Sequence, residues 1–176
     1  MSPPAVVRIA GNGMNRVAGE DMVAALVALH GTCFAPLPET PWSETAFRAL
    51  LNVPTTHAWV AGALDGPDGG GIQGLLMVRE LAGDWEVLTV CVAPEARRRG
   101  VARALFAEFL AAAGDDANVV LEVAIDNEPA IKLYMEFGFQ PVGRRPGYYA
   151  GAAGERVDAL ILGRMRRVWT TERYPM

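Results

Sequence analysis

The chain has 176 residues, of which 51% are hydrophobic and 20% charged, and its net charge is −4. These values are typical of a globular domain with a substantial core. They argue against a disordered chain and against a general nucleic-acid binder. No uninterrupted apolar run reaches membrane-spanning length, and the N-terminus lacks the basic start and apolar block of a signal peptide. We therefore expect no membrane binding. The two cysteines, Cys33 and Cys91, have neither a disulfide-framework nor a metal-site spacing, so we also expect a cytoplasmic protein that binds no metal.

The predicted elements begin with a short strand, for which residues 6–9 and 14–17 are alternatives. From residue 20 to residue 30 apolar residues recur at helical spacing, and the glycine that follows is expected to end this helix. A proline-rich loop comes next. Ser43 is then placed to cap a second helix over residues 44–51.

Three strands follow at residues 57–64, 72–81 and 87–92, and the short turns between the last two favour an antiparallel meander. A helix over residues 101–113 leads into a strand at residues 119–123. So long a helical crossover predicts that this strand runs parallel to the one before it.

The last predicted elements are a helix and two strands. Asn127 is placed to cap the helix, and Gly138 to end it in the left-handed conformation. The strands are expected at residues 139–145 and 156–163, with residues 146–154 as the loop between them. Because the sequence has no repeat and no linker, we expect one α/β domain over the whole chain.

The stretch that leads into the helix at residues 101–113 is the most informative. Its strand ends in Val-Ala-Pro, and three arginines and Gly100 then precede the helix. Glycine lets a ligand come close to the backbone, and a helix N-terminus offers unpaired N–H groups and a partial positive charge to an anion. We therefore expect a phosphorylated ligand here, although a basic turn before an ordinary helix is the alternative. The two common phosphate-loop motifs, GxxxxGK[ST] and GxGxxG, are absent.

The motif Arg-x-x-Gly-x-Ala after this strand resembles the pyrophosphate loop of the GNAT superfamily of N-acetyltransferases, and the order of elements is similar as well. Pro-Trp-Ser-Glu at residues 41–44 and Arg-Arg…Tyr-Tyr at residues 144–149 resemble the RimI-like branch, the bacterial ribosomal-protein-alanine N-acetyltransferases. The resemblance covers roughly residues 20–162. It implies a single GNAT fold with a core at about residues 14–164, six to seven strands and about four helices, in which a parallel pair follows an antiparallel meander. One departure is Ala93, which stands where an aspartate is usual, and the glycine-rich segment at residues 65–71 looks inserted.

The resemblance implies acetyl-CoA as co-substrate, with direct transfer of the acetyl group in a ternary complex. The N–H of Val92 would polarise the thioester carbonyl, and an aligned donor of this kind can contribute ~3 kcal/mol. Asn127 is expected to contact the cofactor or to act only as a helix cap. The full set of implied cofactor-binding residues is Val90, Cys91, Val92, Arg97, Arg98, Arg99, Gly100, Val101, Ala102, Arg103 and Asn127.

Two residues are candidates for catalysis. Glu122 is a carboxylate within an apolar strand, and an unpaired buried carboxylate is costly. A general-base role explains it, and the resemblance places the proton acceptor here; a carboxylate that faces solvent or pairs with a structural arginine is the alternative. For Tyr134 the resemblance implies a proton donor to the departing thiolate, and core packing is the alternative. Cys91 as a covalent nucleophile is disfavoured by its apolar neighbours.

Three aromatic residues, Trp42, Tyr148 and Tyr149, are candidates for the peptide-binding wall. The leading prediction is acetylation of a protein N-terminal α-amino group, with the N-terminal alanine of a small-subunit ribosomal protein as acceptor. A lysine side chain or a small-molecule amine is the second possibility, and a non-catalytic acetyl-CoA-binding protein is the third. The few arginines give no reason to expect direct nucleic-acid binding.

Overall fold

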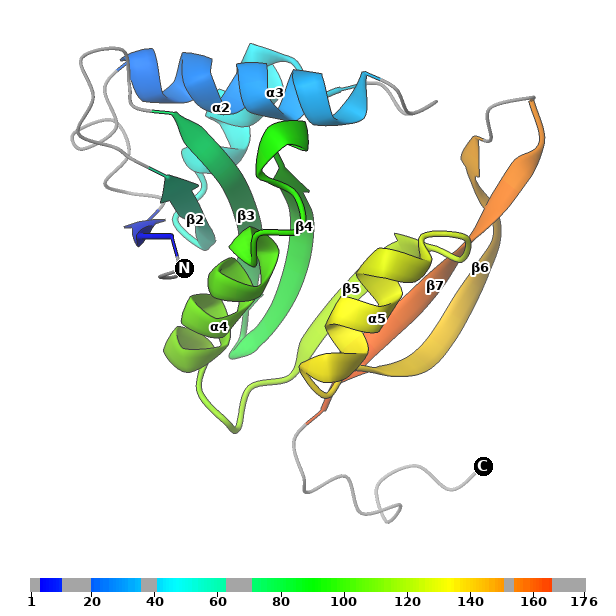
Figure 1. Cartoon of the computed structure of the whole chain (residues 1–176). Helices are drawn as coiled ribbons and strands as arrows, with labels where there is room; N and C mark the ends of the chain where they lie inside the picture. The colour runs from blue at the N-terminus through cyan, green and yellow to red at the C-terminus, as the bar shows by residue number, and fades with distance from the viewer. Residues whose placement is uncertain (1–3, 11–19, 36–40, 63–70, 151–153, 166–176) are drawn as a thin grey trace.

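The computed structural model describes residues 4–10, 20–35, 41–62, 71–150 and 154–165, which form one seven-stranded mixed sheet and four α-helices (Figure 1). The sheet order is β1-β2-β3-β4-β5-β7-β6. The strands are β1 (Val6–Ala10), β2 (Thr56–Gly62), β3 (Ile72–Leu81), β4 (Asp84–Val92), β5 (Val119–Ala124), β6 (Gln140–Ala150) and β7 (Arg156–Arg164). The helices are α2 (Glu20–Phe34), α3 (Glu44–Leu51), α4 (Val101–Ala113) and α5 (Glu128–Glu136), with a 3-10 turn at Pro94–Ala96.

The predicted order of elements is confirmed. Strands β2, β3 and β4 form the antiparallel meander, and β5 runs parallel to β4. The two predicted helix caps form as well, because Ser43 Oγ accepts the Ala46 N–H at 3.2 Å and Asn127 Oδ1 accepts the Ala130 N–H at 3.3 Å. Gly138 follows α5 with a φ of 86°, the left-handed conformation expected of it.

Of the two alternatives for the first strand, the one at residues 6–9 is confirmed by β1, so the sheet begins ahead of the core boundary expected near residue 14; the alternative at residues 14–17 lies outside the described residues. Several other boundaries differ from the prediction. Strand β4 begins at Asp84 rather than at residue 87. Helix α2 continues through Gly31, because its last turn packs His30 on Phe34 and buries Cys33. Strand β6 continues to residue 150, which places both tyrosines of the expected loop in a strand.

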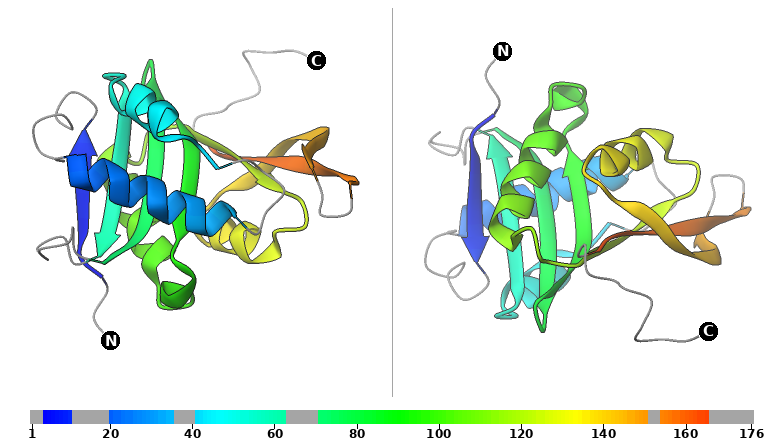
Figure 2. Two further views of the ribbon diagram at one scale, coloured as in Figure 1. Left: turned by 90° about the horizontal axis from the view of Figure 1, so that it is seen from above. Right: turned by 90° about the horizontal axis from the view of Figure 1, so that it is seen from below.

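The helices cover the two ends of the sheet differently (Figure 2). Helices α2 and α3 lie on one face of the part formed by β1 to β4, and α4 lies on its other face. Helix α5 lies on the same side as α4 and covers β5, β7 and β6. Aromatic side chains join these layers: Phe109 of α4 packs against Trp59 and Trp85, while Phe106 packs against Tyr134 of α5. We call β1 to β4 with α2, α3 and α4 the β1–β4 half, and β5, β7 and β6 with α5 the β5–β7–β6 half.

The two halves meet along a short parallel contact between β4 and β5. Only Trp85 and Glu86 of β4 have partners on β5, namely Val119 and Val120. Beyond this contact β5 pairs with β7 alone, and β4 continues to its end beside β3. Leu88 is an extra residue in β4, at a register shift opposite Met77 and Val78, and a bulge of this kind bends a strand. The two strands therefore diverge toward their carboxyl ends (Figure 1).

Candidate active site

The end of β4 presents backbone groups to the side from which β5 has diverged. The Ala93 N–H donates to the Gln73 carbonyl at 2.9 Å, so Ala93 faces β3. Successive residues of a strand direct their backbone groups to opposite sides, so the N–H of Val92 points away from β3. The described chain places no strand there beyond the first two pairs of β5. This N–H is thus a donor aimed into the opening between the strands, as predicted for the thioester carbonyl.

The loop between β4 and α4 holds two residues in the left-handed conformation. Arg98 has a φ of 62° and Gly100 a φ of 83°. Glycine adopts this conformation freely, whereas a residue with a Cβ loses roughly 1–2 kcal/mol. Gly100 is the N-cap of α4 and has no side chain with which to cap it, so the N–H groups of the first turn remain available to an anion.

The four arginines of this loop and helix fall into two classes. Arg97 Nε donates to the Val92 carbonyl at 3.2 Å, and Arg103 forms an ion pair with Glu136 of α5 at 2.5 Å. Both are held within the fold. Arg98 and Arg99 are exposed, and neither has an ion pair or a side-chain hydrogen bond with the part of the chain that the structure describes. Of the arginines predicted to bind phosphate, Arg98 and Arg99 are therefore the two whose guanidinium groups have no partner among the described residues.

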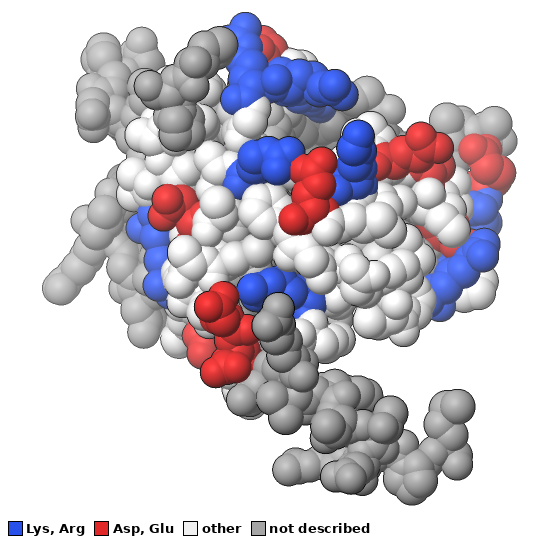
Figure 3. All heavy atoms as spheres, turned by 60° about the horizontal axis from the view of Figure 1, so that its bottom comes forward, with Lys and Arg blue, Asp and Glu red and all other residues white. Residues whose placement is uncertain are grey.

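Charged groups are interspersed over this side of the molecule. Figure 3 shows one face of the molecule, on which groups of Lys and Arg alternate with Asp and Glu, and the net charge of the chain is −4. Selective binding of an anion here therefore depends on local geometry, namely the first turn of α4 and the two unpaired guanidinium groups, rather than on a broad positive potential.

Glu122 lies on β5 opposite the buried side of that strand. Its neighbours Leu121 and Val123 are buried, while 28% of the Glu122 side chain is exposed. Its Oε1 accepts a hydrogen bond from Arg145 at 2.8 Å. The carboxylate is therefore neither fully buried nor unpaired, contrary to the expectation drawn from its apolar neighbours in sequence. This pair matches the arginine alternative, and it leaves Oε2 without a hydrogen bond from the described residues.

Tyr134 is buried on α5 and packs against Phe106, with ring centroids 5.3 Å apart, and against Phe139. Burial, together with the nearby Tyr149 phenol, raises the pKa of Tyr134 well above its usual value. The phenol therefore stays protonated at neutral pH and can serve as a donor. The core-packing alternative also holds for its ring, so this residue combines both features.

The β6–β7 hairpin carries Arg145, Tyr148 and Tyr149. The guanidinium carbon of Arg145 lies 4.3 Å from the centre of the Tyr148 ring, and the two tyrosine rings meet edge to face at 5.0 Å. Residues 146–148 bulge opposite Asp158, whose carboxylate accepts the Gly147 N–H at 2.6 Å. This hydrogen bond and the Arg144 guanidinium lower the pKa of Asp158. Asp158 thus fixes the bulge that displays Arg145 and Tyr148.

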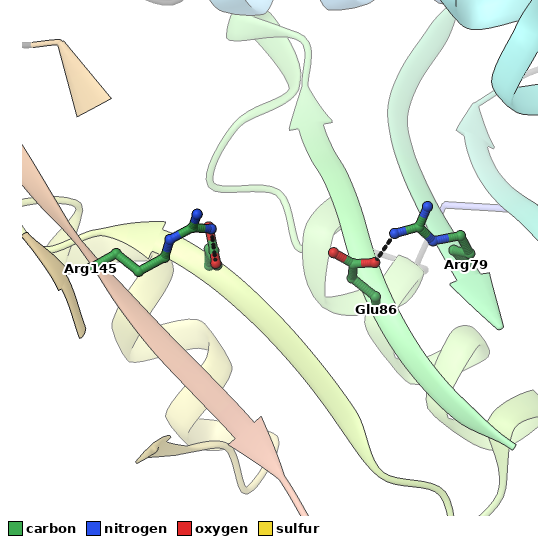
Figure 4. Close-up of polar contacts among 4 residues, drawn as sticks. Arg79, Glu86 and Arg145 are labelled. Atoms are coloured by element: carbon green, nitrogen blue, oxygen red, sulfur yellow. Dashed lines mark hydrogen bonds and ion pairs between the residues drawn. The ribbon is translucent and has the colours of Figure 1, made fainter. Parts of the chain in front are cut away.

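A second ion pair lies across the opening from Glu122. Arg79 of β3 pairs with Glu86 of β4 at 2.5 Å, and Figure 4 shows this pair on the opposite side of the opening from Arg145. Glu86 is in register with Val120, two residues before Glu122, so the two carboxylates lie on one face of the sheet. Glu86 is held by an arginine of the neighbouring strand β3, and Glu122 by an arginine of β6, two strands away.

Trp42 lies in an aromatic cluster between α2 and α3, where it stacks on His30 at 5.0 Å and meets Phe47 at 5.4 Å. Its ring therefore takes part in core packing. Asn127 is exposed and caps α5, which agrees with both alternatives for this residue.

The contact between Arg145 and Glu122 could not be predicted from the sequence. Arg145 lies inside the Arg-Arg…Tyr-Tyr motif, yet nothing in the linear order points to Glu122, which lies 23 residues earlier.

The contact between the two cysteines was not predicted either. The fold brings Cys33 and Cys91 together at the end of β4. The Cys91 thiol, with help from Arg97, lowers the pKa of Cys33 to about 7, and burial and Cys33 raise that of Cys91.

The comparisons with known proteins agree with this geometry. Residues 23–139 match the acetyltransferase (GNAT) family. The chain belongs to the GNAT family of acetyltransferases. Its N-acetyltransferase class and its mixed sheet with one parallel pair are thereby established. Among the described residues, no helix combines the length and the apolarity needed to cross a lipid bilayer.

Individual relatives point to one branch of this family. The N-alpha-acetyltransferase RimI of Mycobacterium tuberculosis is 38% identical over 112 residues, which are 63% of this chain and 69% of that protein. An uncharacterized protein of Mycobacterium leprae is 37% identical over 128 residues, which are 72% of this chain but 34% of that longer protein. The ribosomal-protein-S18-alanine N-acetyltransferase from Escherichia coli has the same fold, with a TM-score of 0.73 at 19% identity over 98% of this chain and 100% of that one.

Proposed function

We propose that this protein is a RimI-like N-alpha-acetyltransferase that transfers an acetyl group from acetyl-CoA to the N-terminal amino group of a protein. Members of the GNAT family use acetyl-CoA. The proposed acceptor is the N-terminal alanine of a small-subunit ribosomal protein, by similarity to the relatives described above. The two free buried cysteines support a reducing, cytoplasmic location.

The observation that carries this proposal is the divergence of β4 and β5. It leaves the Val92 N–H unpaired by β5, next to a loop with an open helix N-terminus, while Glu122 stands on the diverging strand. In the proposed complex the first turn of α4, with Arg98 and Arg99, holds the diphosphate of the cofactor. Val90, Cys91 and Val92 lie along its pantetheine arm. The Val92 N–H then polarises the thioester carbonyl, where negative charge develops.

The chain's side chains account for both proton movements. Glu122 accepts a proton from the α-ammonium group, directly or through one water, so that the neutral amine can attack the carbonyl carbon. Because an α-amino group has a pKa of roughly 7.7–8.0, a weak base is sufficient. As the carbon–sulfur bond breaks, Tyr134 donates its proton to the thiolate. Tyr148 contacts Arg145, the partner of Glu122, and Tyr149 lies near enough to Tyr134 to affect its pKa, so we place the acceptor chain along these two tyrosines.

The test is a panel of acceptors incubated with acetyl-CoA, read by mass shift and by fragment position. We expect acetylation at the α-amino group of an Ala-initiated ribosomal peptide, and less on the same peptide with a blocked N-terminus and a free lysine. Glu122→Gln should fold normally and lose roughly 10²–10⁴-fold in turnover. Tyr134→Phe should keep its affinity for acetyl-CoA and transfer more slowly.

The competing functions give different results. Acetylation confined to lysine or to polyamines would replace the N-terminal acceptor with the second alternative. Binding of acetyl-CoA without turnover on any amine would indicate the non-catalytic protein. Full activity of Glu122→Gln, with an unchanged pH profile, would remove the general-base assignment.

A further inference from the structure

We propose that Arg145 is a positioning residue for the transfer: its guanidinium fixes the Glu122 carboxylate through one oxygen and leaves the other for the proton of the acceptor amine. The inference rests on the proposed function and adds a residue that the sequence did not assign. It follows from the path of the Arg145 side chain, from what holds that side chain, and from the single oxygen that it contacts.

The path of the side chain is set by the register of three strands. Glu122 of β5 and Arg145 of β6 are not on neighbouring strands, because β7 lies between them. Arg145 is in register with Ala159, which is in register with Ala124, so only small side chains occupy its row. Figure 4 shows the Arg145 side chain crossing β7 and ending over β5. A large residue at position 159 would obstruct this path.

Arg145 is held in place before any substrate binds. Its guanidinium stacks on Tyr148 at 4.3 Å, and the bulge that presents both residues is fixed by Asp158 through the Gly147 N–H. The pair with Glu122 raises the pKa of Arg145, which therefore carries its charge at every working pH. Although 51% of the Arg145 side chain is exposed, its guanidinium contacts both Tyr148 and Glu122.

Arg145 contacts only one of the two carboxylate oxygens of Glu122. Arg145 binds Oε1 of Glu122 at 2.8 Å, and no described residue donates a hydrogen bond to Oε2. A carboxylate held on one oxygen has a fixed orientation, and its second oxygen remains a free acceptor.

Other charged groups near this face are accounted for within the structure. On the β4 side, Glu86 is paired with Arg79. On the hairpin side, Asp158 is paired with Arg144, and Tyr148 and Tyr149 are the remaining titratable groups. From α5, Tyr134 stays protonated. Arg145 is thus the one cation that the structure places in contact with Glu122 among the described residues.

The test compares Arg145→Gln and Arg145→Lys with Arg144→Gln as a matched control. Arg144 is the adjacent arginine of the same strand, but it pairs with Asp158 rather than Glu122. With the best acceptor of the panel, Arg145→Gln should lower kcat roughly tenfold and leave the KM for acetyl-CoA within about twofold. Arg145→Lys should recover only part of the kcat, since it keeps the charge but lacks the planar fork.

A second measurement does not depend on turnover. The Glu122 carboxyl carbon is followed by NMR at one fixed pH. Its chemical shift should differ from the wild type in Arg145→Gln but not in Arg144→Gln, because only Arg145 contacts Oε1. An unchanged chemical shift in Arg145→Gln would overturn the proposal, and so would equal loss of kcat in Arg145→Gln and Arg144→Gln. If the chemical shift changes but no N-terminal amine is acetylated, the contact with Glu122 stands and the proposed acceptor is wrong. If Glu122→Gln keeps full activity, Arg145 has no base to position and the proposal fails.

Discussion

The two halves of the sheet differ in how far helices cover them and in how deeply their strands are buried. In the β1–β4 half helices cover both faces, and every residue of β2 is buried. In the β5–β7–β6 half α5 is the only described helix that covers the sheet, and no residue of β6 is fully buried. The first half concentrates apolar side chains, whereas the second displays ion pairs and tyrosines on its open face. The comparison indicates that stability resides mainly in one half and proton transfer in the other, with the cofactor expected at the divergence between them.

The largest effect is expected from a core truncation in the β1–β4 half. Phe109 is fully buried and packs edge to face against Trp59 and Trp85. Phe109→Ala should lower the free energy of unfolding by about 3–5 kcal/mol, because it removes a large apolar side chain and leaves a cavity. Urea unfolding measures this change. Val142→Ala is the matched control in the other half, where the side chain is largely exposed, and it should change stability by less than about 0.5 kcal/mol. Equal losses of unfolding free energy in the two variants would contradict the inference that stability resides mainly in the β1–β4 half.

A smaller effect concerns the pH dependence of stability. His30 is buried in the β1–β4 half, where neither ring nitrogen has a hydrogen-bond partner among the described residues, and it stacks on Phe34 and Trp42. Burial lowers the pKa of His30 to about 4, against about 6.5 in the unfolded chain. The unfolded chain therefore binds the additional proton between these two values. This contribution to stability is complete above about pH 6.5 and is lost as the pH falls toward 4, by about 3 kcal/mol.

The variant that checks this is His30→Phe, which keeps an aromatic ring in the cluster. Its free energy of unfolding, measured by urea at several pH values between 7 and 4, should fall less steeply than that of the wild type. Asp158, whose pKa is lowered in the folded state, adds to the slope only at the low end of this range, because its contribution is lost mainly as the pH falls below the ordinary carboxylate value. If the wild type and His30→Phe lose stability in parallel over this range, the buried imidazole is not the cause.

The difference between local spacing and contacts across the sheet explains which features the sequence could predict. Apolar runs, caps and crossover length were sufficient for the meander, the parallel pair and the Ser43 and Asn127 caps, because these depend on local spacing. The partner of Glu122 could not be predicted, because it depends on how far a side chain reaches across an intervening strand. Strand β6 was predicted too short for a related reason. Its continuation depends on Asp158, a residue of the next strand, which accepts a backbone N–H within the bulge.

The smallest expected effect separates the arginines at the boundary between the halves. Arg99 has no partner among the described residues, whereas Arg103 joins α4 of one half to Glu136 of the other. Arg99→Gln should weaken coenzyme A binding by about 1 kcal/mol, roughly fivefold by calorimetry, and the loss should shrink at high salt. Arg103→Gln should leave this affinity within about twofold and lower the free energy of unfolding by at most about 1 kcal/mol, since its ion pair is exposed. If Arg103→Gln proved the more damaging to binding, its guanidinium would have to leave Glu136 for the diphosphate. The boundary between the halves would then rearrange on cofactor binding.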